Sequence, residues 1–195
     1  MPKQRRKPKL LQPNLNPNRR KKPKKAAPTE SDPDLFGKGL IVVGKVLEIS
    51  EVEGSDKLIQ GEIDIGIGEP RHVVAGLKAF FAPEDLVNKR LLVAANLKPA
   101  KLAGILSEVM ILAATGDDGS VKYITPPEGA NVGERASIEG FPQLAEPAKN
   151  LNSKQWGKIV DHLHVQNEVA MFKEHKILVN GTECACHVND GAKIK

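Results

Sequence analysis

The sequence predicts a mainly β protein, built around a small closed barrel of about five short strands with Greek-key connections. The apolar segments are short, since the longest unbroken run, 109–114, has six residues, far below the roughly 20 of a membrane helix. Turn residues separate these segments, and the clearest of them alternates apolar and polar side chains with a period of two. A basic arm precedes the barrel, and a smaller α+β segment follows it.

Residues 1–29 hold 11 of the chain's 29 Lys and Arg residues and no acidic residue, so the rest carries 18 basic against 24 acidic residues. With many prolines and few apolar side chains, this stretch cannot bury enough surface to offset the entropy of ordering it. We therefore predict a disordered arm over 1–38. Its charge lies mainly in two clusters, Arg5, Arg6 and Lys7, then Arg19, Arg20, Lys21, Lys22, Lys24 and Lys25.

The arm's charge density favours binding to a polyanion, most simply to nucleic acid phosphates. A solubility tail, or a nuclear or organellar address, is the alternative. No apolar stretch follows the basic residues, so we do not expect a secretory signal peptide. Two cysteines are too few for a disulfide framework, which points to a reducing compartment.

The barrel domain is expected over 39–141. The first strand should span 40–49, with Gly44 as a bend or bulge. The segment 59–67 alternates isoleucines with polar residues, which is typical of a half-buried strand, and 71–77 follows as a third.

A short helix is predicted at Pro83, because proline suits a first helical turn and acidic residues follow it there. Two apolar strands, 91–95 and 109–114, come next. A last short strand at 123–125 ends at Pro126-Pro127.

The α+β extension is expected over 142–195. Asn152 can cap a helix that runs to Leu163. Strands are predicted at 169–172 and 177–179, then a tight turn at Asn180-Gly181 and a returning strand over 184–188. Four side chains of the helix should face inward, namely Trp156, Ile159, Val160 and Leu163.

One window of the acidic body is purely basic. Between Asp85 and Glu108 the only charged residues are Lys89, Arg90, Lys98 and Lys101. A phosphate backbone could therefore approach this side only, although chance clustering on a solvated surface would look the same.

The segment Asn96-Leu97-Lys98-Pro99-Ala100-Lys101-Leu102-Ala103-Gly104-Ile105-Leu106-Ser107-Glu108-Val109-Met110 resembles the signature of the tRNA-binding domain of the endothelial monocyte-activating polypeptide II type. The likeness continues upstream through Ser55-Asp56-Lys57-Leu58 and Arg71-His72-Val73-Val74-Ala75-Gly76-Leu77. It covers residues 38–195, because the end of the chain resembles the C-terminal extension of eukaryotic members.

The resemblance implies an OB-fold that grips the outer corner of tRNA by shape and backbone and delivers it to an aminoacyl-tRNA synthetase. It also implies an extension packed on the barrel like a second subunit, hence a monomeric body. No catalysis, cofactor, metal or membrane association is implied. The expected compartment is the cytoplasm, with the mitochondrion as the alternative.

The resemblance also implies the residues of the RNA site. Lys98 and Lys101 would reach phosphates, while Asn96 and Ser107 would hydrogen-bond to phosphate or ribose. Met110 would offer an apolar contact to a base or sugar. Arg90 and Arg71 either widen the cationic face or form surface ion pairs. Alternatively, Asn96 holds a turn and Met110 belongs to the core.

The chain departs from the pattern where many relatives carry arginine. Ala103 precedes the signature glycine, and Val42-Val43 precedes Gly44 in the first strand. Both changes remove positive charge, so we expect the barrel alone to bind RNA weakly and the arm to supply much of the affinity. For the same reason we do not expect the cytokine-like activity of some relatives.

Two other clusters resemble metal or catalytic motifs. Cys184 and Cys186, followed by His187, lack the spacing and the second ligand pair of a zinc site, so we interpret the cysteines as core residues. His162 and His164 lie at a predicted helix end, where histidine suits the helix dipole. Nothing in the sequence indicates an enzyme.

A scaffold protein is the main alternative function. Its barrel would dock a synthetase or another complex while the arm alone held RNA, and a general RNA-binding or ribosome-associated protein is also possible. The partner surface of the scaffold would be acidic, formed by Glu48, Glu51, Glu53, Glu62 and Asp64.

Overall fold

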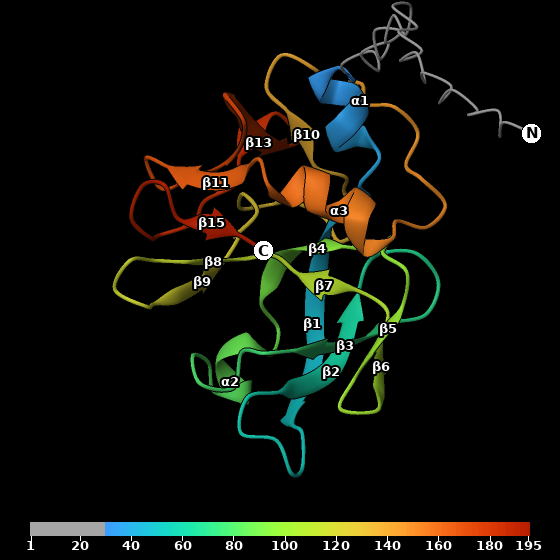
Figure 1. Cartoon of the computed structure of the whole chain (residues 1–195), viewed down its shortest axis with the longest axis vertical. Helices are drawn as coiled ribbons and strands as arrows, with labels where there is room; N and C mark the ends of the chain where they lie inside the picture. The colour runs from blue at the N-terminus through green and yellow to red at the C-terminus, as the bar shows by residue number, and fades with distance from the viewer. Residues whose placement is uncertain (1–29) are drawn as a thin grey trace, which may run out of the picture.

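The computed structural model describes residues 30–195, and the two basic clusters of the predicted arm lie outside these residues. Within them the chain is mainly β, with three short helices (Figure 1). A five-stranded barrel occupies one half of the molecule, and a second curled sheet with two of the helices occupies the other.

Ordered structure begins before the predicted boundary at Gly39. Residues Asp32–Gly37 form helix α1, with Pro33 in its first turn. Leu35 and Phe36 of this helix are buried, and the Phe36 ring meets the edge of Phe172 at a centroid distance of 5.2 Å. The prediction of a disordered arm was therefore wrong for this part, because two apolar residues in a six-residue helix show no periodicity in the sequence.

Strands β1 (Ile41–Glu51), β2 (Ile59–Asp64), β3 (Arg71–Ala75), β4 (Arg90–Ala94) and β7 (Met110–Ile111) form the barrel, in the order β3-β2-β1-β4-β7. All four pairings are antiparallel. A parallel bridge joins Val73 of β3 to Val109, the residue just before β7, and nearly closes the barrel. The interior is apolar and includes Val46, Ile63, Val73, Leu91, Val93 and Ile111.

The bend of β1 lies beyond Gly44, the position where we expected it. The register against β2 shifts between Val46 and Glu48, so Leu47 is the extra residue. Gly44 has another role, because a Cβ atom there would lie 2.7 Å from Cγ2 of Ile63. The glycine thus lets β1 approach a side chain of the barrel interior. The predicted short helix is confirmed as α2 (Pro83–Leu86), with Leu86 fully buried.

The predicted strand 109–114 divides between the two sheets. Its first part is β7, and its second part continues as β8 (Ala113–Thr115) in the second sheet beside β9 (Val121–Tyr123). The remaining strands of that sheet are β10 (Ser137–Ile138), β11 (Leu163–Gln166), β12 (Val169–Phe172), β13 (His175–Val179), β14 (Thr182–Glu183) and β15 (Lys193–Ile194).

The second sheet joins strands from both sides of the predicted boundary at 141/142. Its order is β10-β13-β12-β11-β15-β8-β9, with β14 on β13. Lys193 and Ile194 pair with Thr115 and Ala114, so the end of the chain adds a strand next to the continuation of the barrel. The barrel and the extension therefore share one hydrogen-bonded sheet.

Helix α3 (Ser153–Val160) starts where the sequence predicted. The Asn152 side chain accepts a hydrogen bond from the Gln155 N–H, and the Gln155 side chain accepts one from the Asn152 N–H, so the helix has a reciprocal N-terminal cap. Trp156 and Ile159 are buried as expected. The helix ends at Val160, however, because Leu163 already belongs to β11.

The turn at Asn180-Gly181 is confirmed, with φ of 51° and 75°. The strand that returns from it is Thr182–Glu183, not 184–188, where only Ala185 makes isolated bridges. Cys184 and Cys186 are free and buried in the core, as predicted. Burial raises the pKa of the Cys184 thiol to about 12 and that of Cys186 to about 11.

No helix formed by residues 30–195 has the length and apolar character needed to cross a membrane.

Candidate nucleic-acid interface

The signature segment forms a β-hairpin at the closing edge of the barrel. Strands β5 (Ala100–Leu102) and β6 (Ile105–Ser107) pair only with each other (Figure 1). Ala103 and Gly104 connect them with φ of 50° and 83°, the left-handed conformation of a tight two-residue turn. We did not predict this hairpin, because each strand has three residues and Ala-Gly is a weak turn signal.

Two exposed lysines lie on this hairpin and the loop before it. Lys101 is in β5, and Lys98 is in the loop after β4. The Lys98 N–H donates to the Leu151 carbonyl at 2.8 Å, which fastens the loop to the extension. Neither ammonium group forms an ion pair with any residue in 30–195. Both positive charges are therefore available to a ligand, on backbone that the fold holds in place.

Ser107 fastens the hairpin to the barrel. It is 8% exposed, and its Oγ accepts from the Val74 N–H at 2.9 Å and donates to the Val109 carbonyl at 3.0 Å. The neighbouring Glu108 accepts from the His72 N–H and forms an ion pair with Arg71 at 3.3 Å. Arg71 thus matches the alternative interpretation of a surface ion pair.

Asn96 joins three backbone segments. It is 7% exposed; its Oδ1 accepts from the Leu40 N–H, and its Nδ2 donates to the carbonyls of Lys38 and Ala148, all at 2.8 Å. The polar groups of Asn96 and Ser107 bond to backbone partners inside the protein, and these bonds hold the loop and hairpin that carry the lysines. Direct RNA contacts by the two residues stay a prediction.

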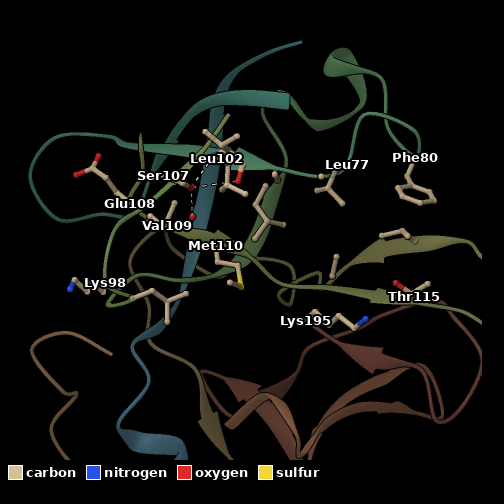
Figure 2. A pocket seen from close by; sticks show the side chains of 18 residues that line it. Leu77, Phe80, Lys98, Leu102, Ser107, Glu108, Val109, Met110, Thr115 and Lys195 are labelled. Carbon is tan, nitrogen blue, oxygen red and sulfur yellow. Dashed lines mark hydrogen bonds between the residues drawn. The ribbon is translucent and has the colours of Figure 1, made fainter. Parts of the chain in front are cut away.

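Met110 lines a cavity of about 400 Å³ between the hairpin, the end of β3 and the start of the second sheet. It is half-buried, and it pairs with Ala94 at the end of β4. Figure 2 shows its side chain near the middle of the cavity, with Lys98 toward one end and Phe80 toward the other. Met110 therefore combines a core contact with a wall that a ligand can reach.

Arg90 lies apart from Lys98, Lys101 and Met110. Arg90 starts β4 and pairs with Lys45, whereas Met110 pairs with the last residue of the same strand. Its side chain is exposed, but it does not extend the surface formed by Lys98 and Lys101.

The acidic surface proposed for a scaffold is present on β1 and β2. Glu48 lies directly opposite Glu62 in the strand register, and both are exposed. Glu51 forms an ion pair with Lys78 at 2.8 Å, and Asp64 lies opposite Lys45. Within the described residues, no three His, Cys, Asp or Glu side chains are grouped so that they could hold a metal ion.

Comparison with known proteins identifies the family. Residues 41–135 match the family described as "Putative tRNA binding domain". The C-terminal domain of p43 from Plasmodium vivax superposes with a TM-score of 0.77 and 32% identity, over 82% of this chain and 98% of that domain. The chain belongs to the tRNA-binding domain family.

Other members of this tRNA-binding domain family are parts of longer proteins. The chain is 37% identical over 146 residues to the cytoplasmic methionine–tRNA ligase of Arabidopsis thaliana, covering 74% of this chain and 18% of the ligase. It is 34% identical over 159 residues to aminoacyl tRNA synthase complex-interacting multifunctional protein 1 of Mus musculus, covering 80% of this chain and 50% of that protein. The chain thus spans about a fifth to a half of these relatives.

Proposed function

We propose that the chain is a non-catalytic, structure-specific tRNA-binding protein that delivers tRNA to an aminoacyl-tRNA synthetase, as a separate factor or an appended domain. The observation that carries the proposal is the pair of unpaired lysines, Lys98 and Lys101, at the closing edge of the barrel. Cations without intramolecular partners suit contacts with phosphates. Hydrogen bonds of Lys98 N–H and Ser107 hold the backbone that carries both lysines, which supports recognition of a defined arrangement of phosphates.

The strand order supports an OB-fold for residues 39–141. The bridge between β3 and the segment before β7 is parallel, the other pairings are antiparallel, and α2 lies between β3 and β4. We propose that the extension, 142–195, acts as a built-in second subunit and keeps the body monomeric. The pairing of β15 with β8 and the Lys98–Leu151 hydrogen bond favour this role, because both join the extension to the barrel near the lysines.

The matched relatives favour a role beside a synthetase. Two are named as a methionine–tRNA ligase and a protein that interacts with a synthetase complex. The ligase match covers 18% of that enzyme, so it supports a shared tRNA-binding part and not a shared reaction.

The test is tRNA binding by the full chain and by Lys98→Ala/Lys101→Ala over a range of salt concentrations. Each lost phosphate contact makes the slope of log K against log salt shallower by about 0.7 to 0.9, so we expect a change of about 1.5. Affinity should fall similarly for all tRNAs, because phosphates carry no sequence information. Unstructured RNA should compete poorly.

The matched control is Lys57→Ala/Lys122→Ala, which removes the same charge from two exposed positions outside the basic window 86–107. It should leave most of the affinity intact. If the two double variants bind tRNA equally well, the site on the barrel is wrong. The scaffold function is then favoured, with the acidic surface that contains Glu48 and Glu62 as the docking face.

A further inference from the structure

The cavity beside the hairpin has walls that are apolar and partly exposed. Phe80 is 46% exposed and Leu102 is 40% exposed, although both side chains are large and hydrophobic. The Phe80 backbone is fixed by a turn in which its N–H donates to the Leu77 carbonyl at 2.9 Å. Leu77 and Met110 complete the walls, and Figure 2 shows these side chains around one hollow. Such a surface is suited to bind an apolar or aromatic group.

The surroundings of the cavity are cationic. Lys98 and Lys195 both line it, and Lys101 lies on the adjoining strand β5. The one carboxylate on its wall, Glu108, is already bonded to Arg71 and to the His72 N–H. The charges at the rim therefore suit an anionic occupant.

We infer that the cavity receives an unstacked base of the bound RNA, while the lysines hold the flanking phosphates. The inference rests on the proposed tRNA binding and extends the base or sugar contact expected of Met110 to a cavity that holds a whole base. A nucleotide has the two parts that this site matches, a flat aromatic face and an adjacent negative charge. The cavity volume of about 400 Å³ lies within the roughly 300 to 1,000 Å³ of small-molecule sites.

Gly76 makes a direct test possible. It lines the cavity, its φ is not in the left-handed region, and a Cβ placed on it meets no atom within 4 Å. The variant Gly76→Leu should therefore fold normally and fill the space that a base would occupy. Phe80→Ala tests the same site by removing the aromatic wall. Ile67→Ala is the matched control, since Ile67 is 53% exposed and does not line the cavity.

The experiment measures tRNA affinity of the full chain and these variants over a range of salt concentrations. Stacking on an aromatic side chain has little dependence on salt, so Phe80→Ala and Gly76→Leu should weaken binding about tenfold with an unchanged salt slope. This signature differs from that of Lys98→Ala/Lys101→Ala, whose slope becomes shallower. Fluorescence of Trp156, the chain's one tryptophan, checks that each variant is folded.

A second measurement observes the base directly. tRNA transcripts that carry 2-aminopurine at one exposed position each are mixed with the protein. At one of these positions, the 2-aminopurine fluorescence should change on binding to wild type but not on binding to Gly76→Leu.

The outcomes separate the two proposals. In one outcome wild type binds tRNA, Lys98→Ala/Lys101→Ala binds it more weakly, and both cavity variants bind it as tightly as Ile67→Ala. The base contact is then wrong and the proposed function stands. If wild type does not bind tRNA, both fail.

Discussion

Asn96 and Ser107 lie in the segment that resembles the family signature, yet both direct their polar atoms into the protein. Asn96 connects Lys38, Leu40 and Ala148 through three hydrogen bonds, and Ser107 connects β6 to β3. These bonds hold the backbone from which Lys98 and Lys101 project. At the scale of the residue, the site thus divides into charged side chains that face solvent and polar side chains that position them.

The variant Asn96→Ala should destabilise the fold by about 3 kcal/mol, because the Leu40 N–H and the Ala148 carbonyl lose their partners in a part-buried place and the Lys38 carbonyl keeps only the Ala148 N–H. Urea denaturation measures this loss. Asn150→Ala, at an exposed position nearby, should stay within about 0.5 kcal/mol of wild type. If the Asn96→Ala protein is as stable as wild type but binds tRNA more weakly, a direct contact between Asn96 and RNA is favoured instead.

The sequence could predict which residue types form the site, but not whether each side chain faces solvent or the protein interior. Lys98 and Lys101 were expected at the surface, and they are exposed. The residue types of Asn96, Ser107 and Met110 are compatible with a ligand contact and equally with an internal role. Both roles need a polar or flexible side chain near the binding loop. Only the fold decides, because the partners of Asn96 are more than 50 residues away in the chain.

Among the elements, helix α1 has a larger role than its six residues suggest. Phe36 packs on Phe172 of β12, Asp32 bonds to Lys173, and Arg135 donates to the Gly37 carbonyl at 2.6 Å. The helix therefore fastens the start of the described chain to the second sheet.

The variant Phe36→Ala should cost about 3 to 5 kcal/mol of stability, because it removes a fully buried aromatic ring. The same change at Phe80, which is 46% exposed, should cost much less. Thermal or urea unfolding of the two variants makes the comparison. Equal losses would mean that α1 does not belong to the core.

Elements with a strong local pattern were predicted well, and the others were not. The alternation of apolar and polar side chains in β2 and the capping of α3 by Asn152 depend only on residues close together in the sequence, so both were predicted. Strands β5, β6, β10 and β15 have two or three residues each and carry no measurable period. The passage from β7 to β8 at Leu112 was missed because the segment is apolar on both sides of the change of sheet.

For the whole molecule, the distribution of charge sets the expected mode of binding. Residues 1–29 carry 11 basic and no acidic residues, whereas 30–195 carry 18 basic and 24 acidic residues. The described body is net negative, and Lys98 and Lys101 lie together at the closing edge of its barrel. Long-range attraction to RNA must then come largely from the first segment, and position on the RNA from the body.

Removal of residues 1–29 should weaken tRNA binding strongly at low salt and make the salt slope shallower, since up to 11 cations are lost. For the shortened protein, the slope of log K against log salt should correspond to about two phosphate contacts, those of Lys98 and Lys101. Titrations of the two proteins at several salt concentrations measure this. An unchanged affinity would show that the body alone supplies the attraction.

The pairing of β15 with β8 also has a consequence for folding. Ala114 lies just after the last barrel strand, but its partner Ile194 comes 80 residues later in the chain. Contacts between such distant segments slow folding, and until they form the edge of β8 is open to pairing with other chains. Because Lys195 follows β15 directly and lines the same cavity as Lys98, the cavity is incomplete until β15 has paired with β8. Only molecules in which this pairing has formed would then offer the whole cavity to tRNA.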